Sequence, residues 1–210
     1  PVWPDETLAS TFVPLLRRQG RRCSSIVGPT AQVNALWRLL EPIWGTARAV
    51  RAHQPVMSMR EYPRIEVDHQ VRYARTSDID VLLPACVDMF TGEVGISPVA
   101  QGGGPAYRAR LMDLIGQRHS LIRTDNQGVL FKAELGVVSA HVGQVQGVWV
   151  RPDMRGRGIA VPAMAAVVRK VLDDIAATCS LYVNDFNAPA LATYRAVGFE
   201  QVDEFATVLF

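Results

Sequence analysis

The segment from Gln146 to Ala177 limits the possible folds more than any other part of the chain. Val148, Trp149 and Val150 are β-branched or aromatic and favour a strand, which Pro152 ends. After a short turn, apolar residues recur at helical spacing: Ile159, Met164, Val167, Val168, Val171, Leu172 and Ile175. The segment therefore predicts a strand, a glycine-rich turn and a helix in direct succession.

The turn between this strand and this helix has the properties of an anion-binding site. Gly156 and Gly158 allow the backbone to turn tightly and to approach a ligand without a Cβ in the way. The first N–H groups of a helix are free and carry a partial positive charge, to which Arg155 and Arg157 add full charges. We expect the turn to hold a phosphate or pyrophosphate. Its spacing is neither that of a P-loop nor that of the three-glycine dinucleotide fingerprint.

Two motifs carry a family resemblance. The segment Arg155-Gly-Arg-Gly-Ile-Ala160 resembles the Arg/Gln-x-x-Gly-x-Gly/Ala turn of the GNAT acetyltransferase superfamily. The segment Asn187-Ala-Pro-Ala-Leu-Ala-Thr-Tyr-Arg-Ala-Val-Gly-Phe199 resembles the later Asn-x-x-Ala-x-x-Leu-Tyr-x-x-x-Gly-Phe motif of that superfamily, with Thr193 where relatives usually carry leucine. The motifs occur in the expected order and spacing, and the resemblance covers residues 71–210.

The resemblance implies the GNAT acyl-CoA N-acyltransferase fold. This is an α/β (α+β) fold with a mixed, mostly antiparallel sheet of six to seven strands flanked by helices. The sequence agrees in its order of elements, which we expect as strand 71–75, helices 76–89 and 107–116, strands 120–124, 129–140 and 142–150, a helix from 159, strand 181–184, helix 189–197, and one or two strands in 199–210. In this fold, strand 142–150 and the strand after the long helix splay apart, and the gap holds the pantetheine arm of coenzyme A.

Two domains are predicted, a small α/β N-terminal domain over residues 1–67 and a GNAT domain over residues 68–210. The first part reads as helix, strand, helix and strand, with Pro55 breaking the last strand. It is either a degenerate GNAT-like half, since Gly28-Pro-Thr-Ala31 lacks the arginine-glycine chemistry, or a small cap on the catalytic domain. The whole pattern, including Phe90–Pro98, is similar to actinobacterial (mycobacterial-type) GNAT proteins with an additional N-terminal domain of unknown function.

Composition argues against several other classes of protein. A net charge of +2 is too balanced for a nucleic-acid binder that relies on a broad basic surface. The three cysteines and four histidines show no metal-ligand spacing, so we expect reduced thiols, no metal site and a cytoplasmic location. No apolar run reaches transmembrane length, and the first residues show no signal pattern, so no membrane partner is expected. We expect a monomer or a homodimer.

The resemblance implies an acyltransferase that passes an acetyl group from acetyl-CoA, its cosubstrate, directly to a primary amine in a ternary complex. The acceptor is a small amine, an amino acid or a protein amine. The implied cofactor-binding residues fall into the strand, the turn and the last helix, namely Val148, Trp149, Val150, Arg155, Gly156, Arg157, Gly158, Ile159, Ala160, Asn187 and Tyr194. Asn187 either contacts the cofactor arm or caps the last helix. Tyr194 is the implied catalytic proton donor to the leaving thiolate.

The motifs leave the general base open. An amine with a pKa of about 10 is protonated at neutral pH and must lose a proton before it attacks. Several relatives place a glutamate on the central strand where this chain has Gln144. Our candidate base is Glu93, in an irregular segment after the first helix of the GNAT domain, which in this fold usually lines the acceptor pocket. The alternatives are Glu134, which also reads as a solvated strand residue, and ordered water with backbone carbonyls.

Two other functions stay open. Without the strand glutamate, the chain can act as an acyl-CoA-binding sensor with little or no turnover. Alternatively, the N-terminal part is a protein-interaction module and the GNAT domain serves as its scaffold. The length of the acyl chain is not determined by the sequence.

Overall fold

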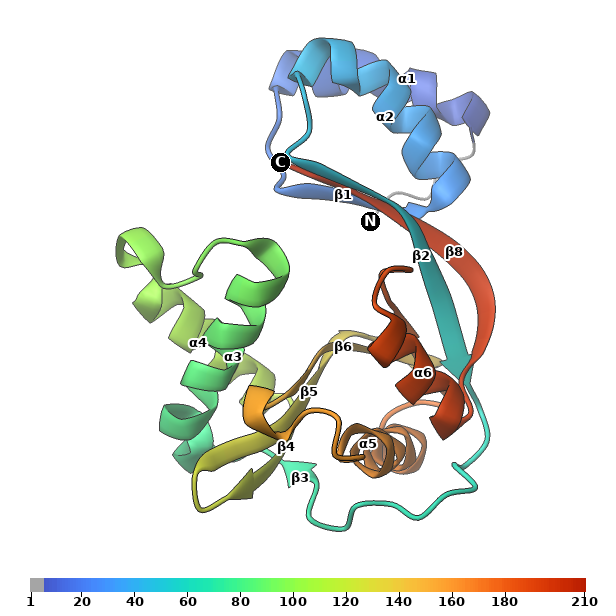
Figure 1. Cartoon of the computed structure of the whole chain (residues 1–210). Helices are drawn as coiled ribbons and strands as arrows, with labels where there is room; N and C mark the ends of the chain where they lie inside the picture. The colour runs from blue at the N-terminus through green and yellow to red at the C-terminus, as the bar shows by residue number, and fades with distance from the viewer. Residues whose placement is uncertain (1–5) are drawn as a thin grey trace. The chain divides into compact units, whose positions relative to one another are not determined.

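A computed structural model of the chain describes residues 6–210. Figure 1 shows its elements, which in chain order are α1 (Glu6–Gln19), β1 (Ser25–Pro29), α2 (Thr30–Trp44), β2 (Ala49–Met59), β3 (Arg72–Tyr73), α3 (Ile79–Val94), α4 (Gly104–Gly116), β4 (Ser120–Asp125), β5 (Gly128–Val138), β6 (Val142–Val150), α5 (Ala160–Asp174), β7 (Thr178–Tyr182), α6 (Ala188–Val197) and β8 (Glu200–Leu209). The predicted α/β fold is confirmed. Of the strands, β3 to β8 fall in residues 68–210, where six or seven were expected.

Contacts divide the chain into two compact units, which we describe separately. The terminal unit consists of the residues up to Met57 together with Tyr182–Leu191 and Gln201–Phe210, and the central unit consists of Ser58–Leu181 and Ala192–Glu200. Because the terminal unit takes strand residues from both ends of the chain, it is not a continuous segment. The division at residue 67 stays a prediction.

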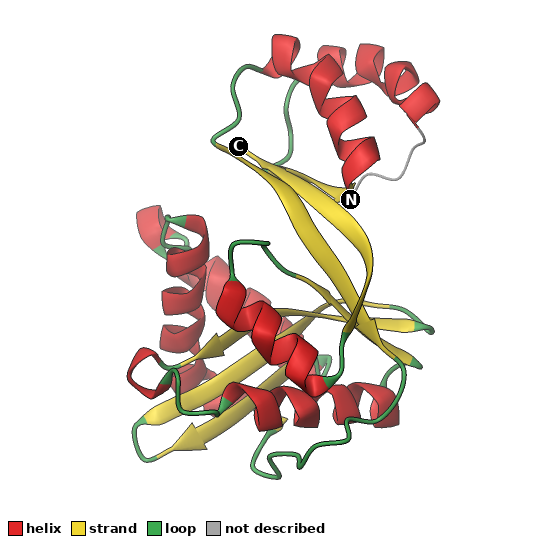
Figure 2. Cartoon of the chain, turned by 45° about the vertical axis from the view of Figure 1, so that its right-hand side comes forward, coloured by secondary structure: helices red, strands yellow, loops and turns green. Residues whose placement is uncertain are grey.

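The central unit is built on strands in the order β7-β6-β5-β4-β3. The pairs β3–β4, β4–β5 and β5–β6 are antiparallel, and β6–β7 is parallel. Helices α3 and α4 pack side by side on one face of these strands, and α5 packs on the other (Figure 1, Figure 2). Buried side chains of both helices and of β4, β5 and β6 form the core on the first face: Ile79, Leu82, Ala85, Cys86, Tyr107, Leu111, Ile115, Ile122, Val129 and Trp149.

The terminal unit is built on β1, β8 and β2, with β1 antiparallel to β8. Helix α2 packs against β1 and α1 because its apolar residues recur at helical spacing, so that Val33, Leu36, Trp37 and Leu40 are buried on one face. The aromatic ring of Phe210 lies 5.4 Å from the ring of Trp37 and 5.7 Å from that of Trp44, between ring centroids. These contacts place the last residue of the chain in a core made by its N-terminal helices.

Two details of the sequence prediction were wrong. The strand β2 is not broken at Pro55, because proline lacks only the N–H donor and its carbonyl still accepts a hydrogen bond, here from Val183 at 3.2 Å. The strand after the long helix begins at Thr178, not at Leu181. Its polar start, Thr178 to Ser180, is buried and paired with β6, which polarity alone does not reveal.

Asp78 ties β3 to the first turn of the helical segment that follows. The Arg72 guanidinium donates to its two carboxylate oxygens at 2.7 and 2.9 Å, and the Arg75 N–H donates to Oδ2 at 2.7 Å. The hydrogen bond from Arg72 lowers the pKa of Asp78 from its usual value. The carboxylate side chain is only 14% exposed, so these bonds are partly shielded from water.

We expect Asp78→Ala to lower the free energy of unfolding by about 1–3 kcal/mol, because the charged hydrogen bonds are lost and Arg72 loses the carboxylate that neutralises its charge. The folded-state pKa lies below the unfolded-state pKa, so this stabilisation is present at neutral pH and is lost as the pH falls through the folded-state value. Urea unfolding of wild type and Asp78→Ala at neutral and acidic pH measures the difference in the free energy of unfolding. Glu61→Ala is the control, since the exposed Glu61–Arg64 pair at 3.4 Å contributes about 0.5 kcal/mol or less. Equal effects of the two substitutions would contradict the prediction.

Candidate functional site

The turn after β6 begins at Arg151, a residue that the sequence prediction missed. Its guanidinium donates to the two carboxylate oxygens of Asp125 at 2.8 Å each and to Asp153 at 2.9 Å. The hydrogen bond from Arg151 lowers the pKa of Asp125 to about 2, so the pair stays charged at neutral pH. The backbone N–H of Arg151 donates to the Leu130 carbonyl at 3.0 Å. Together these bonds fix the turn against the β4–β5 hairpin, a long-range contact that no local pattern predicts.

The glycine-rich part of the turn has the open geometry expected of a ligand site. Gly156 and Gly158 have φ values of +71° and +75°, which side-chain-bearing residues rarely adopt, and a Cβ at either position would meet no atom within 4 Å. Arg155 donates from Nε to the Val150 carbonyl at 3.0 Å. Helix α5 follows at Ala160, and no side chain caps its first N–H groups. No side chain therefore competes for these N–H groups, an arrangement compatible with an anion-binding turn.

The central strand β6 contains a β-bulge at Gly147. Its register with β5 pairs Gln146 with Glu134 and then Trp149 with Lys132, so one more residue lies between the pairs on β6 than on β5. Gly147 has a φ of +59°, the left-handed conformation that a bulge of this kind requires. An isolated glycine within a strand pattern is a sequence signal for a bulge, and this one was missed.

The pairing of β6 with β7 ends just before the bulge. The parallel register joins Val142–Val145 of β6 to Thr178–Leu181 of β7, whereas β6 continues to Val150. The residues after Val145 therefore have a β5 partner on one side and no β7 partner in this register on the other. This is the splay that the family resemblance implied, and it frees backbone groups along one edge of the strand.

A buried ion pair lies beside the bulge, on the α3 face of the strands. Lys132 Nζ donates to Glu134 Oε1 at 2.7 Å, and the side chains are 0% and 6% exposed. Lys132 also donates to the Gly147 carbonyl at 2.9 Å and contacts Met89 Sδ at 3.3 Å. The reading of Glu134 as a solvated strand residue is wrong, because β5 is covered on both faces. The signal was two opposite charges two residues apart within an apolar run, which places them on one face.

The comparisons with known proteins agree with this geometry. Residues 115–199 match the model of the Acetyltransferase (GNAT) family. Over this segment the chain is similar to GNAT acetyltransferases. Residues 1–82 match a Domain of unknown function (DUF4081), so the expected N-terminal part of unknown function is confirmed. No curated protein matches the chain.

Solved GNAT structures share the fold. An acetyltransferase of the GNAT family from Colwellia psychrerythraea has a TM-score of 0.64 at 14% identity, covering 99% of this chain and 74% of its own. A predicted acetyltransferase with acetyl-CoA from Clostridium acetobutylicum has a TM-score of 0.51 at 18% identity, covering 63% and 90%. AAC(6')-Iy in complex with the bisubstrate analogue CoA-S-monomethyl-acetylneamine has a TM-score of 0.50 at 18% identity, covering 63% and 91%.

Within the GNAT domain, Tyr194 of α6 is a buried, neutral phenol. Its side chain is 7% exposed, and its ring packs edge-on against Phe199 at 5.9 Å between centroids. Burial raises the pKa of Tyr194 well above its usual value, and the negative charge of Glu93 raises it further. The structure therefore brings the two candidate catalytic residues within electrostatic reach of each other.

Glu93 does not lie in an irregular segment, which corrects the sequence prediction. Helix α3 continues through Gly92 to Val94 and ends at Gly95, whose φ is +76°. A glycine inside a helix is tolerated, whereas a left-handed glycine just after the last turn is a common stop, so Gly95 ends the helix. Glu93 thus lies in the last turn of α3.

The other predicted residues hold varied positions. The Trp149 indole N–H donates to Asp88 Oδ2 at 3.0 Å, so its side chain is committed to the core. Asn187 Oδ1 accepts the Ala190 N–H at 3.2 Å and caps α6, one of the two roles expected of it. Within residues 6–210, no group of three or more potential ligand residues gathers as for a metal ion, and no helix is long and apolar enough to cross a membrane.

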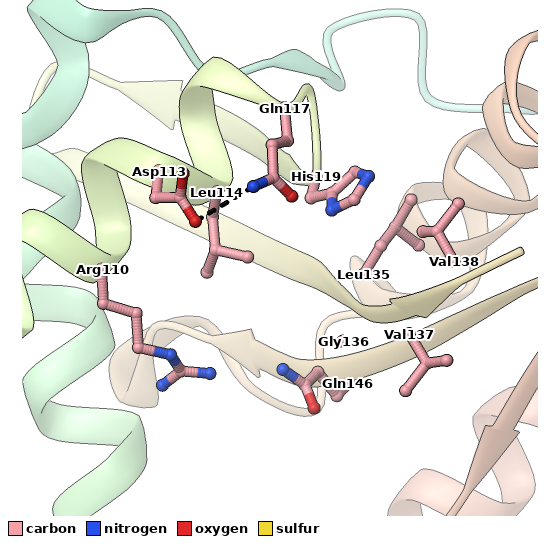
Figure 3. A pocket seen from close by; sticks show the side chains of 10 residues that line it. All are labelled: Arg110, Asp113, Leu114, Gln117, His119, Leu135, Gly136, Val137, Val138 and Gln146. Atoms are coloured by element: carbon pink, nitrogen blue, oxygen red, sulfur yellow. Dashed lines mark hydrogen bonds between the residues drawn. The ribbon is translucent and has the colours of Figure 1, made fainter.

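A pocket of about 480 Å³ lies between α4 and the strands β5 and β6 (Figure 3). Its lining mixes polar and apolar side chains: Arg110, Asp113, Leu114, Gln117, His119, Leu135, Gly136, Val137, Val138 and Gln146. The amide of Gln146 lies over Gly136, where a Cβ would collide with it. Gln144, which stands at the position of the strand glutamate, is not among the lining residues.

We expect Gly147→Ala to lower the free energy of unfolding by about 1–2 kcal/mol, because alanine is strained at a positive φ. Its Cβ would also lie 3.2 Å from both Lys132 Nζ and Met89 Sδ. The matched control is Gly92→Ala in α3, where a Cβ meets nothing within 4 Å, and which should stabilise by about 0.5–1 kcal/mol. Denaturant unfolding of the two variants should therefore give changes of opposite sign. If Gly147→Ala left the free energy of unfolding unchanged, the bulge would not be fixed.

Proposed function

We propose that the chain is an enzyme that transfers an acetyl group from acetyl-CoA directly to a primary amine. The observation that carries this proposal is the open turn at Gly156 and Gly158, which joins a bulged strand to an uncapped helix N-terminus. An arrangement of this kind suits a pyrophosphate, whose charge the free N–H groups and two arginines stabilise. The acetyl-CoA in the Clostridium acetobutylicum structure and the coenzyme A analogue bound to AAC(6')-Iy support the same ligand class here.

The cofactor site proposed here has three parts. Residues Arg155 to Ala160 hold the pyrophosphate through backbone N–H groups and charge. The edge of β6 from Val148 to Val150, which β7 leaves unpaired, offers backbone groups to the amides of the pantetheine arm, apart from the Val150 carbonyl, which accepts a hydrogen bond from Arg155. Asn187 contributes by capping α6, the helix that carries Tyr194.

The chemistry needs one proton removed and one supplied. The amine loses a proton and attacks the thioester carbonyl, the carbon–sulfur bond breaks, and the thiolate takes up a proton. Tyr194 is suited to supply that proton, because its raised pKa keeps the hydroxyl protonated at neutral pH. Glu93 is the proposed acceptor of the amine proton, directly or through water. Glu134 is less available for this role, because its Oε1 already accepts hydrogen bonds from the Lys132 ammonium and the Cys86 thiol.

A second function, an acyl-CoA sensor with little or no turnover, is favoured by one feature. Gln144 stands where several relatives place a glutamate, and Glu134, a carboxylate on the neighbouring strand opposite Gln146, is engaged in an ion pair. A sensor would bind acetyl-CoA but would release no thiol when amines are added. The acceptor of the enzyme, whether a small amine, an amino acid or a protein amine, is to be found by screening.

We expect wild-type protein to bind acetyl-CoA in calorimetry and Gly158→Glu to abolish binding, because the substitution places a Cβ and a negative charge where the pyrophosphate should lie. Gly20→Glu is the matched control. Gly20 has a similar φ of +68° and equally open surroundings but lies in the terminal unit, so this variant should bind like wild type. No binding by wild type at any concentration tested would refute the proposed function.

We expect Tyr194→Phe to lower kcat by about 100-fold while the KM for acetyl-CoA changes little, because the proton donor is lost and the ring remains. Thiol release against a panel of primary amines measures both constants. Because burial raises the pKa of Tyr194, the wild-type rate should show no loss from tyrosine ionisation below about pH 10. Tyr62→Phe, at an exposed hydroxyl bound to Asp173, is the control. An unchanged kcat in Tyr194→Phe would remove this residue from the mechanism.

A further inference from the structure

Lys132 is the most completely buried charged group among the described residues, and all its donors are directed at protein atoms. An ammonium group has three donors, and Lys132 Nζ has three acceptors: Glu134 Oε1, the Gly147 carbonyl and Met89 Sδ. Glu134 is itself held further by the Cys86 thiol, whose Sγ lies 3.5 Å from Oε1. Burial raises the pKa of Cys86 to about 12, so the thiol stays a neutral donor. Each of the three donors of the Lys132 ammonium therefore has an acceptor within the protein.

A lysine is an unusual choice in this chain. Of its 22 lysine and arginine residues only Lys132 and Lys170 are lysines, so a basic residue here is nearly always arginine. A guanidinium is a planar fork that suits paired oxygens, whereas an ammonium is compact and can reach acceptors in three directions. The site beside the bulge needs a compact ammonium, because its three acceptors are of different kinds: a carboxylate, a backbone carbonyl and a thioether.

The Gly147 carbonyl is the acceptor with a consequence for the site. Without its hydrogen bond, nothing in the local sequence holds a glycine at a φ of +59°, since glycine adopts many other conformations. Loss of the bulge would shift the register of the residues after it by one position, which turns every following side chain to the opposite face. The backbone groups of Val148 to Val150 would then point elsewhere.

We propose that Lys132 is a positioning residue for the acyl donor. By holding the Gly147 carbonyl it fixes the bulge in β6, and thereby the backbone groups that bind the pantetheine arm. This inference rests on the proposed function, since it assumes that the arm lies along β6. It assigns no proton transfer to Lys132, and it separates the binding of the arm from that of the pyrophosphate, which the turn after Arg155 holds.

The test compares two ligands that share the pyrophosphate. Acetyl-CoA contains the pantetheine arm, whereas 3′-phosphoadenosine 5′-diphosphate contains only the nucleotide and its phosphates. Calorimetry with the full chain should show both binding to wild type. In Lys132→Met/Glu134→Met, acetyl-CoA should bind at least about tenfold more weakly, as expected for the loss of oriented hydrogen bonds, and the nucleotide should bind within about twofold of wild type.

The double variant distinguishes positioning from stability. Lys132→Met alone leaves the Glu134 charge buried without an opposite charge and should lower the Tm markedly, whereas replacing both residues by apolar ones of similar size should restore it. If the lysine were only structural, the double variant would recover acetyl-CoA binding together with its Tm, and the inference would be overturned. Equal weakening of both ligands would also overturn it. Lys170→Met, at the other lysine, is the control and should change neither ligand's affinity.

A further variant tests the inference if the double variant folds poorly. Glu134→Gln keeps Lys132 and its bond to Gly147, so acetyl-CoA should bind within about threefold of wild type. A selective tenfold loss in Glu134→Gln would show that the ion pair, and not the bond to Gly147, sets the site. If wild type binds neither ligand, the proposed function itself fails. If wild type binds both and the double variant does too, only the inference about Lys132 fails.

Discussion

The geometry of the candidate site depends on one buried ammonium group. Lys132 joins β5, α3 and the bulge of β6 through hydrogen bonds of 2.7 and 2.9 Å and a contact of 3.3 Å. Each bond formed with a fully desolvated charge is stronger than its counterpart in water, and each missing one would be costly. The strand therefore has a defined conformation at the point where a regular sheet would carry straight on. A strand that must offer its edge to a ligand cannot keep that edge paired.

The turn after β6 is fixed in a different way. Its first residue, Arg151, is held by two aspartates at the surface, while Gly156 and Gly158 leave the space in front of the helix open. A ligand site in this turn needs both features: rigid support at Arg151 and no Cβ at Gly156 and Gly158. A pyrophosphate must meet N–H groups that already point toward it, since ordering them on binding would reduce the affinity.

The sequence predicted the fold and the anion-binding turn, because both depend on local patterns. Apolar periodicity defined α5, and glycines beside arginines marked the turn. It did not predict Arg151–Asp125 or Lys132–Gly147, because these join residues 26 and 15 positions apart, whose proximity is a property of strand register. Glu134 was misjudged for the same reason: whether a strand face is solvated depends on which helices cover it. Glu93 was misplaced because the helix was expected to end at residue 89, whereas α3 continues to Val94 and stops at the left-handed Gly95.

The ion pair also bears on where the amine's proton goes. Gln144 cannot usefully accept a proton at neutral pH, and Oε1 of Glu134 already accepts hydrogen bonds from the Lys132 ammonium at 2.7 Å and from the Cys86 thiol. Glu134 therefore cannot serve both purposes at once: a carboxylate that is bound to Lys132 and helps to shape β6 is not free to accept a proton. The chain uses that carboxylate for shape, which leaves the task of accepting the proton to a group outside β5 and β6. Glu93 satisfies this condition, because it lies in the last turn of α3 and its charge acts on Tyr194. In the proposed mechanism, the base at the end of α3 and the acid on α6 therefore lie outside the two strands whose shape the ion pair maintains.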